Sequence, residues 1–223
     1  MYFSEQDEMA AEQLAAQVYR RLREGGLQAE PVVELACLVE ESGLSGPAVR
    51  EILERRTTEL TPADVARLGR GLLDAMDFEP GFDLEPGRWA TLETALKIVE
   101  RDLYASGIEG ALGITIPDWD DSGCARVEFR GACGSPPIRP SSGRDVDLAI
   151  SDVADAAQDI VMELVWGVWP TCPEHRLGLH AALVEGVAVW QCAGAGTHTA
   201  AAIGDLGLGT RQARRDRSKQ ERA

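Results

Sequence analysis

The stretch from residue 169 to residue 198 constrains the fold of this chain more than any other. It contains all three histidines of the protein and two of its five cysteines, namely Cys172, His175, His180, Cys192 and His198. Thiolate and imidazole groups are ligands for transition metals, and their combination favours zinc over magnesium or calcium. The density of these groups in one short segment therefore predicts a metal site around which the local chain folds.

The spacing of these residues predicts two short turns that carry ligands. Cys172 and His175 form a C-x2-H pair, which lets a tight knuckle present two ligands to one zinc ion. Cys192 and His198 form a second and wider pair, and the two glycines between them can adopt turn conformations. His180 could take the place of His198, so the fourth ligand is open between these two histidines.

Between the two pairs, residues 183–185 and 187–190, apolar except for Glu185, flank Gly186 in the manner of a β-hairpin. Knuckle, hairpin and knuckle follow one another as in a zinc ribbon, and residues 169–206 resemble that family. The resemblance implies a small β unit held by a structural Zn2+. Its four ligands are then Cys172, His175, Cys192 and His198. Zinc ribbons commonly bind other macromolecules, so the resemblance also implies a binding module with a protein partner.

A zinc-dependent hydrolytic enzyme is an alternative reading of the same residues. A catalytic zinc keeps three protein ligands and one position for water, beside a carboxylate that acts as general base. Cys172, His175 and Cys192 could be the three ligands, with Glu174 or Glu185 as the base. The signatures of zinc deaminases and of H-E-x-x-H metalloproteases are absent from the sequence, which favours a structural ion.

The first half of the chain has the periodicity of helices. Apolar residues recur every three or four positions, and glycines, prolines and a Thr-Pro pair mark the ends of the periodic segments. Helices are expected at residues 5–24, 31–41 and 47–56, from residue 61 onward, and at residues 88–105. We therefore expect a helical bundle domain at residues 1–106.

Residues 38–56 within this bundle resemble the helix-turn-helix of bacterial repressors. Gly43 stands at the turn, and Val39, Val49 and Ile52 occupy positions where such motifs pack apolar side chains between two helices. The resemblance implies a DNA-binding regulator, which is a further alternative function. A plain helical hairpin in a small bundle explains the same pattern.

The second half of the chain mixes strands and a long helix. Two short runs at residues 111–117 and 125–131, rich in β-branched and aromatic residues, predict a β-hairpin. Residues 145–166 form the longest helical pattern, with acidic residues along its solvent-facing side. Together with the zinc-ribbon-like unit at 169–206 they form a second domain at 107–210. The predicted fold class is therefore α+β.

The charge of the chain limits its partners. The net charge is −15, and the segment 211–223 contains six basic and two acidic side chains, so residues 1–210 carry −19. An acidic body of this size repels the phosphates of nucleic acids. The basic tail at 211–223 is polar and without periodicity, and it is expected to be disordered. A protein is therefore favoured over nucleic acid as the partner.

The cysteines and the scarcity of lysine indicate the cellular location and the origin of the protein. Five irregularly spaced cysteines do not suit a secreted disulfide framework, and reduced cysteines are typical of the cytoplasm. The apolar runs are too short to span a membrane. Of the 22 lysine and arginine residues only Lys97 and Lys219 are lysines, a bias typical of GC-rich bacterial genes. We expect a cytoplasmic bacterial protein.

Overall fold

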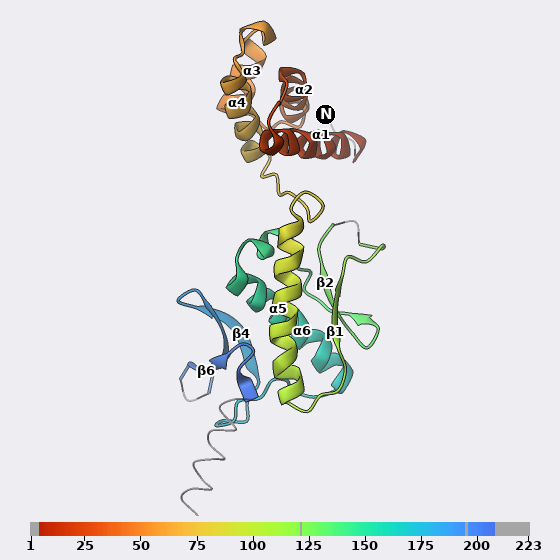
Figure 1. The fold of residues 1–223 in the computed structure, drawn as a ribbon, viewed down its shortest axis with the longest axis vertical. Coiled ribbons are helices and arrows are strands. Elements are labelled where there is room, and N and C mark those ends of the chain that lie inside the picture. Colours follow the sequence, from red (N-terminus) through yellow and green to blue (C-terminus); the bar gives the residue numbers. More distant parts are fainter. Residues whose placement is uncertain (1–4, 121, 195, 208–223) are drawn as a thin grey trace, which may run out of the picture. The chain divides into compact units, whose positions relative to one another are not determined.

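A computed structural model of the chain describes residues 5–120, 122–194 and 196–207, so the basic tail predicted at 211–223 lies outside the described residues. The chain divides into two compact units, residues 1–84 and residues 85–223. In the described residues the elements follow the α+β class predicted from the sequence. In chain order (Figure 1) they are α1 (Glu5–Glu24), α2 (Ala29–Glu41), α3 (Pro47–Glu54), η1 (Thr57–Glu59), α4 (Pro62–Ala75), α5 (Pro86–Ala105), β1 (Leu112–Thr115), β2 (Arg126–Phe129), β3 (Ala132–Cys133), η2 (Pro140–Arg144), α6 (Val146–Val165), β4 (Leu179–Val184), β5 (Val187–Cys192) and β6 (His198–Ala202).

The first unit is a bundle of the helices α1 to α4. Its core consists of aliphatic side chains from all four helices, with Val18, Leu35, Ile52 and Leu72 each at most 1% exposed. The chain turns between α2 and α3 at Gly43, whose φ of +83° lies in the left-handed region that glycine adopts without a steric penalty. The expected pair of helices around this glycine is therefore present.

Ion pairs tie α3 to α4 in the first unit. The guanidinium of Arg55 donates to Glu51 at 3.0 Å and to Asp64 at 3.4 Å, and the guanidinium of Arg67 donates to Glu51 at 2.6 Å. Asp64 also completes a capping box with Thr61 at the start of α4. Glu51 and Asp64 thus pair the charge of Arg55 within the bundle.

The second unit is built on the packed helices α5 and α6. Each of two three-stranded antiparallel sheets, ordered β1-β2-β3 and β4-β5-β6, contacts this helical pair. The two sheets lie on opposite sides of α5 in Figure 1. The core side chains of this unit are fully buried and include Leu92, Phe129, Val153, Ile160 and Trp190. Among the described helices, none is both long and apolar enough to cross a membrane.

The division between the units falls after Leu84, whereas the sequence led us to expect it after residue 106. The helix α5 has the apolar stripe that the sequence predicts, but it packs on α6, η2 and β1 of the second unit. Periodicity identifies the buried face of a helix and not the element that covers it, so the sequence alone predicts α5 in one domain with the helices that precede it.

Candidate metal centre

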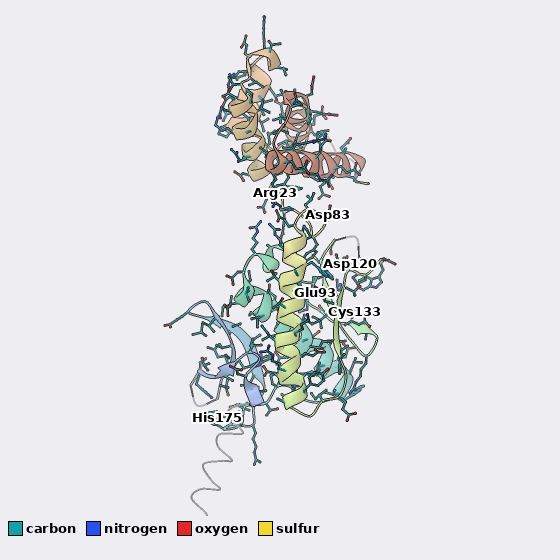
Figure 2. The ribbon with its side chains drawn as sticks, viewed as in Figure 1. Arg23, Asp83, Glu93, Asp120, Cys133 and His175 are labelled. Atoms are coloured by element: carbon teal, nitrogen blue, oxygen red, sulfur yellow. The ribbon has the colours of Figure 1, made fainter. Side chains whose placement is uncertain are left out.

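Three segments of the chain meet at one end of the β4-β5-β6 sheet. In the strand register, Leu179 at the start of β4 lies opposite Cys192 at the end of β5, and Cys192 lies opposite His198 at the start of β6. The turn that carries Cys172 and His175 precedes β4 directly. Figure 2 labels His175 at this end of the sheet. The topology therefore brings all four candidate ligands to one place.

Backbone hydrogen bonds close the first ligand-bearing turn. The N–H of Cys172 donates to the carbonyl of Leu177 at 2.8 Å, and the N–H of Arg176 donates to the carbonyl of Cys172 at 2.9 Å. Arg176 itself has a φ of +57°, which turns the chain back toward β4. The turn places the Sγ atom of Cys172 3.7 Å from the Nδ1 atom of His175.

Three sulfur–nitrogen distances among the four ligand atoms are close to those around a tetrahedral metal ion. The Sγ atom of Cys172 lies 3.7 Å from His198 Nε2, and the Sγ atom of Cys192 lies 3.6 Å from His175 Nδ1. All four atoms lie within 4.8 Å of one another. A tetrahedral zinc ion, with Zn–S and Zn–N bonds near 2.3 and 2.05 Å, separates sulfur from nitrogen by about 3.6 Å. The group could therefore hold a metal ion.

The local electrostatics favour the thiolate form of Cys172. Burial of this thiol opposes ionisation, but the backbone N–H groups of His175 and Glu174 donate to its sulfur and, with the neighbouring side chains, lower its pKa to about 6. The hydrogen bond with Cys172 in turn raises the pKa of His198. Cysteine binds metals as the thiolate, so the lowered pKa of Cys172 favours metal binding at this turn.

Gly194 makes the close packing of the site feasible. Its N–H donates to the Sγ atom of Cys192 at 3.4 Å. A β-carbon on this residue would lie 2.8 Å from Cγ of His175 and 3.0 Å from Cδ1 of Leu177, both shorter than a normal carbon contact. The sequence shows that glycines separate Cys192 from His198, but it does not reveal that one of them receives the ring of His175.

His180 lies apart from this group. It is an exposed residue of β4 and pairs with Gln191 of β5. The cluster of candidate ligands found among the described residues contains His198 and does not contain His180. The geometry therefore favours His198 for the fourth position.

The two carboxylates considered as catalytic bases occupy different positions. Glu185 lies in the turn between β4 and β5, next to the paired residues Val184 and Val187, whereas Cys192 lies at the other end of the hairpin. Five residue steps along a strand separate these ends by about 16 Å. Glu185 is thus too far from the cluster to act on a metal-bound water. Glu174 lies in the ligand-bearing turn, and its side chain is exposed.

Asp102 of α5 anchors the β4-β5-β6 sheet, a role that is not predicted from the sequence. Its carboxylate is fully buried and accepts hydrogen bonds from Trp190 Nε1 at 2.6 Å and from the N–H groups of Gly204 at 2.6 Å and Leu206 at 2.8 Å. Burial raises the pKa of Asp102, although these hydrogen bonds oppose the shift. The sequence signal for this anchoring role is an acidic residue on the apolar stripe of α5, three residues after Val99.

Gln158 of α6 fixes the start of the ligand-bearing turn. Its buried side-chain amide donates to the carbonyls of Trp169, at 2.9 Å, and of Leu179. The indole N–H of Trp169 donates to Ser106 Oγ at 3.0 Å, and its ring packs edge-on against Trp190 with centroids 5.7 Å apart. Hydrogen bonds and ring packing thus connect the ligand-bearing turn to two helices and a sheet.

Comparisons with known proteins give no relative for this chain. No family model, no curated protein and no solved structure matches it. Function must therefore be argued from the geometry and chemistry of the site.

Proposed function

We propose that Cys172, His175, Cys192 and His198 bind one structural Zn2+ ion and that the ribbon-like unit is a module for binding another protein. The sulfur–nitrogen distances of 3.6 and 3.7 Å carry this proposal, because they match a tetrahedral zinc site. Two thiolates and two imidazoles favour zinc over harder cations.

A structural role is better supported than a catalytic one. Structural zinc sites are closed by four protein ligands, whereas catalytic sites keep a position for water. His198 supports the closed arrangement, since its Nε2 atom already lies 3.7 Å from Cys172 Sγ. A zinc-dependent hydrolase would need this position open and a base beside it. Glu185, at the far end of the hairpin, does not supply that base, and Glu174 lies in the ligand-bearing turn with its side chain exposed.

The ion would cross-link three segments that already meet at one end of the β4-β5-β6 sheet. It would link the turn before β4, the end of β5 and the start of β6. Because such a site is not formed in the unfolded chain, its binding free energy becomes folding free energy. The zinc would therefore stabilise the shape of the surface around the ligand-bearing turn.

A helix-turn-helix regulator is the second candidate. The turn at Gly43 and the burial of Val39, Val49 and Ile52, each about 1% exposed, favour it. Charge opposes it, because residues 1–84 contain 17 acidic and 8 basic side chains, a net charge of −9. A salt-dependent shift of duplex DNA by the full chain, lost in Arg50→Ala, would support this function.

A cytoplasmic setting in a bacterium fits the proposed site. Zinc-binding thiolates require reduced cysteines, and the cytoplasm maintains them. All five cysteines of the chain are free in the structure.

Metal analysis of the full chain, purified without chelator, tests the zinc proposal. We expect about one zinc per chain, lost in Cys172→Ser. Cys37→Ser is the matched control, because Cys37 is exposed on α2 and lies outside the cluster. Metal-free protein, or equal zinc content in Cys172→Ser, would contradict the proposal.

A further inference from the structure

A pocket of about 330 Å³ in the second unit is lined by α6 and by the segment 136–142, which includes the start of η2. From α6 it is lined by Leu148, Asp152 and Asp155, which follow one another at steps of four and three residues and so share one face of the helix. Pockets that bind small molecules have volumes of about 300–1,000 Å³, so this pocket, which we call the α6 pocket, suits a ligand at the small end of that range.

Hydrogen bonds fix the wall of the α6 pocket that does not belong to the helix. The N–H of Ile138 donates to the carbonyl of Ala125 at 2.7 Å, and the N–H of Ala125 donates back to Ile138 at 2.8 Å. The N–H of Ser142 donates to the carbonyl of Arg139 at 3.1 Å. The hydroxyl of Ser142, a residue only 5% exposed, donates to the carboxylate of Asp152 and so joins the two walls. The shape of the pocket therefore does not depend on a ligand.

The carboxylate of Asp155 favours a cationic group in this pocket. Burial raises the pKa of Asp155, and the negative charges of Asp152 and Asp159 raise it further, whereas His180 opposes the shift. In the part of the chain that the structure describes, no hydrogen bond or ion pair engages this carboxylate. A positively charged group of a ligand would relieve the repulsion among these carboxylates and provide the partner that Asp155 lacks.

Arg139 provides a place for an anionic group in the same pocket. Its guanidinium lines the pocket and, among the described residues, makes no hydrogen bond or ion pair, so it is not paired with Asp155 either. A guanidinium binds a carboxylate through two parallel hydrogen bonds. The α6 pocket thus presents a cation and an anion that are both available, a combination that a zwitterionic ligand satisfies.

The rest of the lining is apolar. Pro136, Pro137 and Ile138 contribute to one wall and Leu148 to the other. A few charged groups that fix the orientation of a ligand, within a lining of apolar side chains, are typical of small-molecule sites. A small compound with an ammonium group, a carboxylate and an apolar substituent matches this lining.

We propose that the α6 pocket binds a free α-amino acid with a small apolar side chain. The ammonium group faces Asp155 and Asp152, the carboxylate faces Arg139, and the side chain packs on Ile138 and Leu148. This inference goes beyond the proposed zinc-held module and does not depend on its metal, because no residue of the Cys/His cluster lines the pocket.

Saturation-transfer NMR of the full chain with alanine, valine, proline, leucine and isoleucine tests this inference. We expect at least one of these amino acids to bind. Its affinity should fall at least about tenfold in Asp155→Asn and in Arg139→Gln, because each variant loses one charge-assisted contact. Glu163→Gln and Arg144→Gln are the matched controls, since both residues are exposed, remove the same charge and do not line the pocket. Both controls should bind as the unmodified chain does.

Two analogues of valine test the two charges of the ligand separately. Isobutylamine lacks the carboxylate and isovalerate lacks the ammonium group, and each should bind more weakly than valine. Three results would overturn the inference: no binding of any of the five amino acids, affinities in Asp155→Asn equal to those in Glu163→Gln, or isobutylamine bound as tightly as valine, which would make the pocket a site for amines in general. The zinc content of the chain reports on the metal site independently of these outcomes.

Discussion

Replacing Gly194 by alanine should weaken metal binding without removing a ligand. The added β-carbon would lie 2.8 Å from Cγ and 3.1 Å from Cβ of His175, and 3.0 Å from Cδ1 of Leu177. Leu177 can rotate away, but the first two contacts are to the root of the His175 side chain. His175 or the backbone of residue 194 must therefore move by several tenths of an ångström.

The size of the effect follows from the tolerance of a zinc site. Ligand distances hold to about 0.2 Å, and disturbing the residues that orient ligands typically costs 10- to 100-fold in metal affinity. We expect a loss in this range for Gly194→Ala, equivalent to about 1.4–2.7 kcal/mol. The shift acts on His175 Nδ1, which lies 3.6 Å from Cys192 Sγ and 3.7 Å from Cys172 Sγ.

Competition with a chromophoric chelator measures this change in zinc affinity. Gly87→Ala is the matched control, because a β-carbon at Gly87 meets no atom within 4 Å and the residue belongs to the same unit. Its zinc affinity should equal that of the unmodified chain. Unchanged affinity in Gly194→Ala would refute the reasoning that the packing of His175 against Gly194 sets the geometry of the site.

Three further predictions concern the frame around the site and the first unit. Asp102→Ala should lower the free energy of unfolding in urea by about 3 kcal/mol, because one buried and two partly buried donors lose their acceptor. Replacing the exposed Asp205 by alanine should have little effect, and equal stability of the two variants would contradict the anchor role of Asp102. Gln158→Leu should lower the free energy of unfolding by about 2 kcal/mol in the same assay, since the carbonyls of Trp169 and Leu179 lose their donor. An unchanged urea midpoint would contradict this prediction. Hydrogen bonds from the side chain and backbone of Thr61, and then from Arg55, lower the pKa of Asp64. The stabilisation that Asp64 contributes is present above the pKa that it has in the unfolded chain. It is lost as the pH falls through the lower pKa that it has in the folded chain. Hydrogen exchange of α4 amides should therefore be faster in Asp64→Asn at pH 7, and the difference should shrink below about pH 4; a constant difference would refute this.

Local patterns made the helices and the ligand-bearing stretch predictable from the sequence. The capping box of Thr61 and Asp64, for example, marks the start of α4 with residues that contact each other within one turn. The density of cysteine and histidine likewise indicates a metal site without knowledge of the fold. Such signals depend on neighbours in the chain, and the α+β class follows from their order.

The remaining features depend on contacts between distant segments. The strand β6 is rich in alanine, which has a low β propensity, and its pairing with β5, which sets Cys192 opposite His198, holds it in the sheet. The choice of His198 over His180 follows from this pairing and not from spacing. Asp102 meets Gly204 across more than 100 residues of chain, so its role as an acceptor emerges only in the folded unit.

X-ray absorption at the zinc edge of the purified full chain tests the central claim most directly. The proposed closed site predicts two sulfur ligands at about 2.3 Å and two imidazole nitrogens at about 2.05 Å. In His198→Ala one nitrogen should be replaced by an oxygen from water, whereas His180→Ala should leave the spectrum unchanged. A water oxygen among the four ligands of the unmodified chain, or fewer than two sulfurs, would contradict the structural site.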